Sequence, residues 1–223
     1  MTEPDFLRAT RASYDAMAVD YAAWIQDELA AKPLDRAVLA GFAELVRDAD
    51  AGPVADVGCG PGRLTAYLHR LGLPVFGVDL SPRMIAEARR AHPALRFEVG
   101  SMLALDLPDR ALGGILAWYS TIHLPDERLP EIFAEFHRVL APGGHVLVAF
   151  QVGDGVSHRT KAAGHEISLS FHHRRPGPVA DLLDQAGLSV HARLLREPDD
   201  HDDYPEDTPQ AFLLARKPGG ATA

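Results

Sequence analysis

The sequence VADVGCGPGRLTAYL, residues 54–68, decides how this chain is interpreted. The apolar run 53–58 predicts a buried strand, and the stretch after the glycines predicts a helix. Gly58, Gly60 and Gly62 lie between the two at alternate positions. Glycine lets a ligand approach the backbone, and a helix N-terminus offers free N–H groups and a positive dipole end. The stretch therefore predicts a site for a nucleotide-like ligand.

The spacing of the glycines narrows the range of possible ligands. It reads G-x-G-x-G, whereas the dinucleotide fingerprint requires G-x-G-x-x-G, and Arg63 stands where its third glycine would allow close helix–strand packing. Asp79 ends the second predicted strand, 17 positions after Gly62. An acid in that place can accept hydrogen bonds from both ribose hydroxyls. Loop and acid together indicate an adenosine-type ligand whose other end need not be a pyrophosphate.

The rest of the chain predicts a doubly wound α/β fold. Helices are expected over 4–25 and 33–48, and strands at 53–58, 74–80, 95–100, 113–120 and 145–152 then alternate with helices at 63–72, 81–92 and 126–140. Such alternation is typical of a mostly parallel sheet with helices on both faces. A strand at 166–173, a helix at 177–188 and an antiparallel pair at 189–197 and 210–217 close the chain. We expect one domain over 1–218, with a helical cap (1–50), a cofactor-binding core (51–152) and a substrate-side closing region (153–218), followed by a disordered tail at 219–223.

Composition excludes several classes of partner. The 223 residues are 47% hydrophobic and 24% charged, which is typical of a globular protein. A formal net charge of −9 argues against a nucleic-acid partner. The sequence shows no secretory signal and no apolar run long enough to cross a membrane. Its one cysteine, Cys59, fits a reducing compartment. We expect a cytoplasmic monomer or homodimer.

Three stretches carry a family resemblance. VADVGCGPG (54–62), GVDLSPRMI (77–85) and LAPGGHVLV (140–148) resemble the successive motifs of class I S-adenosylmethionine (SAM)-dependent methyltransferases, over roughly residues 54–150. The resemblance implies a Rossmann-like fold with an antiparallel C-terminal strand. It also implies an enzyme that transfers a methyl group from SAM to a small-molecule acceptor and releases S-adenosylhomocysteine.

The resemblance also assigns cofactor residues. Asp79 matches the ribose acid, and Leu80 the residue that packs on adenine. Ser101 and Met102 stand where the family usually has an acid for the adenine amino group. Asp56, Gly58, Gly60 and Gly62 match the loop that holds the methionine part of SAM, and Cys59 lies inside that loop. Tyr14 and Tyr21 resemble tyrosines of an N-terminal cap, of which Tyr21 would reach the methionine end, with helix–sheet packing as the alternative. Trp118 is a candidate wall of the pocket or the cofactor. Alternatives are a loop-bracing role for Asp56, a turn role for Gly60, a surface position for Asp79, a packing role for Cys59 and a core position for Trp118.

The acceptor site is expected in WYSTIHLPD, residues 118–126, after the fourth core strand. Tyr119, Ser120 and His123 lie there, and Tyr14 is expected to join them from the N-terminal cap. Imidazole titrates near neutral pH, so His123 is the candidate general base, with a wall of the pocket as its alternative role. No metal site is predicted.

Two charged stretches keep two interpretations each. His172–Arg175 either recognises an acidic group of the substrate or is the solvated end of a strand. The acidic stretch 197–207 either binds a divalent ion or is a solvated loop. The acceptor atom, whether oxygen, nitrogen or carbon, is not resolved. The rival functions are an NAD(P)-dependent oxidoreductase and a non-catalytic SAM-binding module.

Overall fold

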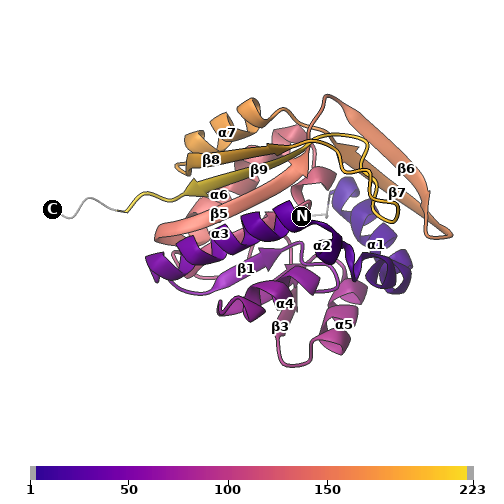
Figure 1. Cartoon of the computed structure of the whole chain (residues 1–223), viewed down its shortest axis with the longest axis horizontal. Coiled ribbons are helices and arrows are strands. Elements are labelled where there is room, and N and C mark those ends of the chain that lie inside the picture. The colour runs from indigo at the N-terminus through magenta and orange to yellow at the C-terminus, as the bar shows by residue number, and fades with distance from the viewer. Residues whose placement is uncertain (1–3, 220–223) are drawn as a thin grey trace.

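The computed structural model describes residues 4–219, and within them a seven-stranded sheet forms the centre of the molecule (Figure 1). Its strand order is β3-β2-β1-β4-β5-β9-β8, and β9 is antiparallel to both of its neighbours. The strands are β1 (Val54–Val57), β2 (Val75–Asp79), β3 (Arg96–Val99), β4 (Leu112–Trp118), β5 (Leu140–Gln151), β8 (Ser189–Arg196) and β9 (Gln210–Arg216). The predicted Rossmann-like fold with an antiparallel C-terminal strand is confirmed.

Helices follow the strands in the predicted order. They are α1 (Asp5–Ile25), α2 (Glu28–Ala31), α3 (Pro33–Ala49), α4 (Arg63–Arg70), α5 (Pro82–Ala91), α6 (Leu129–Val139) and α7 (Pro176–Gln185), with 3₁₀ turns η1 (Thr121–His123) and η2 (Asp126–Arg128). The start of α5 shows the local cause: Ser81 accepts a hydrogen bond from the backbone N–H of Met84, and Pro82 occupies the first turn. Of the predicted tail 219–223, residues 220–223 lie outside the described residues.

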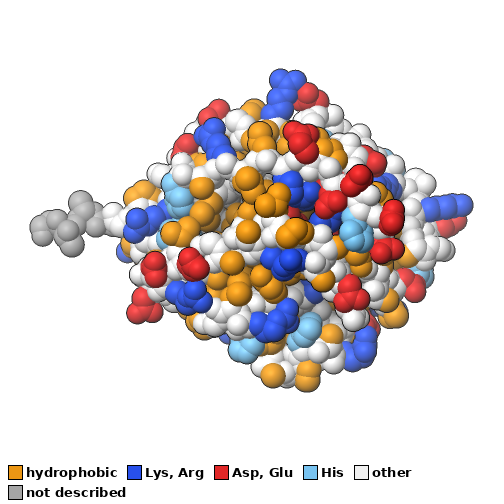
Figure 2. All heavy atoms as spheres, in the orientation of Figure 1, with side chains coloured by type: hydrophobic (Ala, Val, Ile, Leu, Met, Phe, Trp, Pro, Cys, Tyr) orange, Lys and Arg blue, Asp and Glu red, His pale blue; other side chains and the backbone are white. Residues whose placement is uncertain are grey.

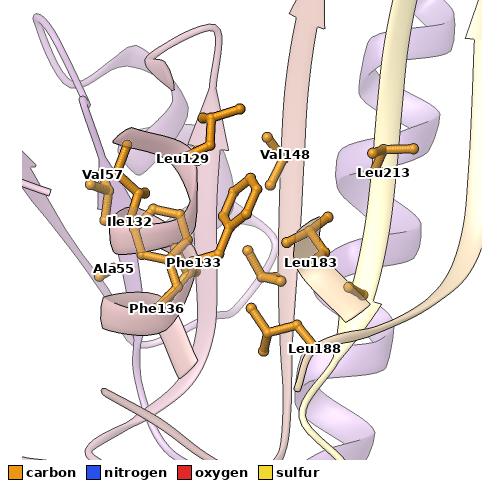
Figure 3. Close-up of a cluster of buried hydrophobic side chains, with 14 of the residues drawn as sticks. Ala55, Val57, Leu129, Ile132, Phe133, Phe136, Val148, Leu183, Leu188 and Leu213 are labelled. Atoms are coloured by element: carbon orange, nitrogen blue, oxygen red, sulfur yellow. The ribbon is translucent and has the colours of Figure 1, made fainter. Parts of the chain in front are cut away.

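Two apolar layers hold the helices on the sheet. On one face α3 and α4 pack on the central strands through Leu39, Phe42, Leu68 and Trp118. On the other face α6 and α7 cover the sheet, and Figure 3 shows side chains of α6, among them Phe133 and Phe136, gathered with those of the sheet. The apolar positions of α6 recur at spacings of three and four, which places them on one side of the helix.

A separate two-stranded hairpin was only half predicted. β7 (His165–His172) matches the expected strand, but its partner β6 (Val156–Ala162) was not expected. Every residue of β6 except Ala162 is exposed, so the segment has no apolar alternation to indicate a strand. The hairpin lies beside α1 at one end of the sheet (Figure 1).

The fifth core strand begins earlier than the expected residue 145, and residues 142–144 lie inside it. β5 begins at Leu140, which is paired with Leu112 of β4. Gly143 has a φ of +86°, and its N–H donates to the carbonyl of Lys217 at 2.8 Å. The glycine therefore bends the start of the strand without ending its pairing.

Acidic side chains gather on the visible face over the segment 197–209, while charges of both signs are scattered elsewhere (Figure 2). No helix among residues 4–219 is long and apolar enough to span a membrane.

Candidate cofactor and acceptor site

A cavity of about 800 Å³ opens at the carboxyl ends of the central strands. Its floor includes the glycine loop after β1 and the residues after β4, and its walls are α1, the β6–β7 hairpin and residues 204–207. The strand order reverses between β1 and β4, which is where doubly wound sheets bind ligands. The volume lies toward the upper end of the range for small-molecule pockets, about 300–1,000 Å³.

The three glycines of the loop have different roles. A Cβ at Gly58 would lie 2.2 Å from the Cβ of Ser120, and one at Gly62 would lie 2.7 Å from the Phe97 ring. Both glycines therefore permit close packing. A Cβ at Gly60 would meet only the ring of Tyr21, at 4.0 Å. Gly60 is thus the glycine whose backbone faces open space, with Tyr21 above it.

Asp79 fixes the glycine loop and faces the same space. Its Oδ2 accepts a hydrogen bond from the N–H of Gly60, and its Oδ1 accepts one from the N–H of Ser81, both at 2.8 Å. Burial raises the pKa of Asp79, and these two N–H groups oppose the shift. Each carboxylate oxygen keeps a second lone pair for a ligand. Asp79 lines the cavity, so its placement fits the predicted ribose contact.

Asp56 braces the loop from below. Its Oδ2 accepts a hydrogen bond from the Thr65 hydroxyl at 2.6 Å, which ties β1 to α4. Burial raises the pKa of Asp56 to about 6. The same burial raises the pKa of Cys59, which packs with Ile85 and Phe97 and remains a thiol. The alternatives of bracing for Asp56 and packing for Cys59 describe these contacts.

Arg63 provides a polar group that sequence reasoning missed. Its Nη2 donates to Glu28 of α2, while its Nη1 is buried and finds no partner in the described chain 4–219. Arg63 lines the cavity near Tyr21, whose pKa burial raises to about 12. The guanidinium and the Tyr21 hydroxyl are two donors suited to a ligand carboxylate.

The adenine-side candidates all reach the cavity. Leu80, Ser101 and Met102 line it, and Leu80 and Met102 also pack on the core. The Ser101 hydroxyl accepts a hydrogen bond from the N–H of Leu103 at 3.3 Å, which shapes the loop after β3. This edge of the cavity therefore offers apolar contacts and a backbone turn rather than an acid.

The residues after β4 divide between core and cavity. Trp118 is buried against Phe212, with ring centroids 5.1 Å apart, so packing is its main role. The hydroxyls of Tyr119 and Ser120 are buried without a hydrogen-bond partner in the part of the chain that the structure describes. Both residues line the cavity, where a ligand can satisfy them.

Tyr14 and His123 form a hydrogen-bonded pair in the cavity wall. The Nδ1 of His123 lies 2.9 Å from the carbonyl oxygen of Ser170, and Nε2 lies 2.7 Å from the Tyr14 hydroxyl. A carbonyl only accepts, so Nδ1 carries the proton and the Tyr14 hydroxyl donates to Nε2. Burial lowers the pKa of His123 to about 4. The expectation of a base that titrates near neutral pH is therefore corrected: both ring nitrogens are hydrogen-bonded, and the imidazole is neutral in the resting site.

Aromatic rings extend this pair along the wall. Phe171, His123, Tyr14, Tyr21 and Trp24 follow one another with centroid separations of 4.8, 5.3, 5.7 and 5.8 Å. Edge contacts of this kind fix ring orientations. Tyr14 and Tyr21 are thereby held on one face of α1.

The basic stretch at the end of β7 is a structural clamp. Arg174 is buried and donates to the carbonyls of Thr121 and Leu124 and to the carboxylate of Asp126. It thereby fixes the turn that carries His123. Neither proposed role for the stretch describes Arg174, because its donors are used within the protein; Arg175 pairs with Asp154 at the surface.

The acidic stretch 197–207 is anchored rather than fully solvated. Buried Lys32 lies 3.1 Å from Asp199 and 3.4 Å from Glu206, and Arg196 bonds Glu206 and Asp35. No group of three or more His, Cys, Asp or Glu side chains among residues 4–219 is arranged to hold a metal ion. The stretch therefore serves as a wall of the cavity that ion pairs hold in place.

Comparisons with known proteins agree with this geometry. Residues 54–144 match the family model described as a methyltransferase domain. The trans-aconitate 2-methyltransferase of Shigella dysenteriae serotype 1 (strain Sd197) is 36% identical over 147 residues, which cover 61% of this chain and 56% of the relative.

Residues 54–144 of this chain form a methyltransferase domain.

Solved structures share the fold of this methyltransferase domain. The methyltransferase CcbJ of Streptomyces caelestis has a TM-score of 0.70 at 21% identity, covering 93% of this chain and 98% of that one. The 1,6-didemethyltoxoflavin-N1-methyltransferase of Burkholderia thailandensis has a TM-score of 0.60 at 22% identity, covering 90% of each chain. The curated relatives, by contrast, are matched over little more than half of their length.

Proposed function

We propose that the protein transfers the methyl group of SAM to a small-molecule acceptor. The observation that carries the proposal is that Asp79, Gly60 and the Tyr14–His123 pair line one cavity. The sulfonium of SAM supplies an activated methyl group, so the protein must align an acceptor and exclude water. The curated relatives are named for methylation of trans-aconitate, a small molecule, which supports the same class of acceptor.

The cofactor is proposed to lie across the glycine loop. Asp79 would accept hydrogen bonds from the ribose hydroxyls through its free lone pairs, and the Gly60 backbone would contact the methionine part. Tyr21 and the unpartnered Nη1 of Arg63 would bind its carboxylate. Leu80 and Met102 would pack on the adenine. Of these contacts, the one to Arg63 would satisfy a buried polar atom that residues 4–219 leave without a partner.

The acceptor is proposed to contact Tyr14. The Tyr14 hydroxyl donates its proton to Nε2 of His123, so its oxygen accepts a hydrogen bond from the cavity side. An acceptor O–H or N–H would bind there. As the acceptor–methyl bond forms and the methyl–sulfur bond breaks, the acceptor proton passes to the Tyr14 oxygen and the Tyr14 proton to His123. Because the pKa of His123 is low, this proton would return through the Tyr14 hydroxyl to water in the cavity once the product leaves, and the resting pair would be restored.

Binding and transfer are tested separately. Calorimetry should show SAM and S-adenosylhomocysteine binding in preference to NADH. Methyl-labelled SAM incubated with a metabolite extract should yield a labelled small molecule. Preference for NADH would support an oxidoreductase instead. Binding of SAM with no transfer to any extract fraction would indicate a non-catalytic module.

Variants of the pair test the proton route. Tyr14→Phe and His123→Gln should each lower kcat by about 10²–10⁴-fold, the usual range for a positioned proton-transfer group. The double variant should be no slower than the slower single variant, because the two residues act in one chain. SAM affinity should change little. Additive losses would contradict the shared route.

The reaction is also proposed to take place in a reducing compartment such as the cytoplasm. Cys59 is the single cysteine, and burial keeps it as a thiol.

A further inference from the structure

We propose that the acceptor is an organic anion, and that Arg159 of β6 binds its acidic group while a separate O–H or N–H of the same molecule contacts Tyr14. The inference rests on the proposed methyl transfer and defines its substrate class. It comes from the charges of the cavity wall on the acceptor side.

The charges of the cavity are sorted by side. The elements around the Tyr14–His123 pair, which are α1, η1 and the β6–β7 hairpin, contribute Arg11, Arg159 and Lys161 to the lining and no carboxylate. The acids of the lining come from the other side, from α2, β1, β2 and residues 204–207. In a chain with a net charge of −9, a wall lined by Arg159 and Lys161 and by no acid is a local exception. Such a wall attracts an anion and repels a cation.

The acids on the other side do not neutralise this wall. Glu28 pairs with Arg63, Asp56 accepts from Thr65, and Glu206 pairs with Arg196. Asp207 also lines the cavity but is exposed to solvent, which screens its charge. Asp79 accepts from the glycine loop and faces the proposed ribose position. No carboxylate among residues 4–219 forms an ion pair with Arg159 or Lys161. The cationic heads of these two side chains are therefore available to a ligand.

Arg159 is the cation best placed to bind the ligand. Its Cα is paired with Leu169 of β7, a buried residue that lines the cavity, and cross-strand partners share one face of a hairpin. Its guanidinium lies 5.1 Å from the centroid of the Phe171 ring. That ring is in turn 4.8 Å from the ring of His123. The stacked guanidinium is thus held near the Tyr14–His123 pair and keeps its N–H groups for a planar oxyanion.

The two contacts require two different groups on the acceptor. Arg159 only donates, so it requires an anionic oxygen. The Tyr14 oxygen only accepts, because its proton is committed to His123, so it requires an O–H or N–H. The methyl group goes to the atom at Tyr14, and its proton leaves through the pair. The acid group remains ionised in the product.

The test fractionates a metabolite extract on an anion exchanger before reaction with methyl-labelled SAM. We expect label in the retained fraction, and we expect the product to be retained again because its acid group is unmodified. Label only in the unretained fraction, or a product that has lost its charge, would overturn this inference and leave methyl transfer intact. Absence of label from every fraction would overturn both proposals.

Substitutions of Arg159 test whether this residue binds the acidic group of the acceptor. Arg159→Gln should raise KM for the acceptor of the retained fraction by about 10- to 100-fold, the range of a charge-assisted contact, with a much smaller change in kcat. Arg159→Lys should recover part of the loss. Arg193→Gln is the matched control, because Arg193 is exposed on β8 and does not line the cavity. An unchanged KM in Arg159→Gln, with an unchanged urea midpoint, would refute the role of Arg159.

Discussion

Substitution of Gly58 by alanine should destabilise the protein through two separable effects. Gly58 has a φ of +78°, a region that costs a residue with a Cβ about 1–2 kcal/mol. The new Cβ would also lie 2.2 Å from the Cβ of Ser120, and such overpacking costs about 1–3 kcal/mol. The expected loss in the free energy of unfolding is therefore about 2–5 kcal/mol.

A second substitution separates the two effects. Ser120→Gly removes the Cβ that causes the clash, and the next contact, the Cα of Ser120 at 3.5 Å, is ordinary. The double variant Gly58→Ala/Ser120→Gly should therefore recover about 1–3 kcal/mol and retain the backbone cost. Gly60→Ala provides the contrast: φ is +53° but no atom lies closer than 4.0 Å, so only about 1–2 kcal/mol should be lost.

Urea denaturation followed by tryptophan fluorescence measures these differences, provided that the m-value is unchanged. SAM affinity, measured by calorimetry, should show the opposite order. Gly60→Ala should weaken SAM binding more than tenfold, and Gly58→Ala should weaken it less. Equal destabilisation at the two glycines, or no coupling between Gly58 and Ser120, would refute the division of the loop into packing and ligand-facing positions.

Three further predictions follow from the contacts. Asp79→Asn should raise the Kd for SAM, measured by calorimetry, at least tenfold. The variant loses the charged group that accepts hydrogen bonds from the backbone N–H groups and, as proposed, from the ribose hydroxyls. An unchanged Kd in a folded variant would remove the ribose assignment. Because the folded-state pKa of His123 is lowered to about 4, kcat should show no acid limb near pH 6.5. The neutral His123 ring should contribute fully to the free energy of unfolding above pH 6.5, and this contribution should be lost as the pH falls through 4. The loss should reach up to about 3 kcal/mol, and His123→Gln should reduce this pH dependence. Lys32→Met should cost about 1–3 kcal/mol in urea denaturation, since it removes the buried cation that pairs with Asp199 and Glu206. A loss below about 1 kcal/mol would show that these ion pairs contribute little.

The sequence was sufficient for the central sheet because its signals are local. The strands β1 and β4 are short apolar runs, and Ser81–Pro82 marks the start of a helix within three residues. The position of Asp79 at the end of β2 follows from the same pattern. The family model covers this same region, residues 54–144.

Contacts between distant parts of the chain were not predictable in this way. The Tyr14–His123 hydrogen bond joins residues 109 positions apart, and the Arg196–Asp35 bond spans 161. Charged side chains are ordinarily exposed, so a polar stretch such as 197–207 is expected to be solvated unless a buried partner is known. Lys32 is that partner, and its own sequence neighbourhood gives no sign of it.

Arg63 shows how a correct inference can rest on an incomplete reason. In the sequence it argues against a dinucleotide because a large side chain would obstruct the packing of helix on strand. In the structure Gly62, one residue earlier, already provides that packing, since its missing Cβ leaves room for the Phe97 ring. The Arg63 side chain turns away to Glu28 and the cavity. A loop that achieves close packing one residue early leaves the next position open for a cation. In the proposed cofactor position, that cation would face the carboxylate of the methionine part of SAM, so Gly62 and Arg63 would serve packing and ligand binding respectively.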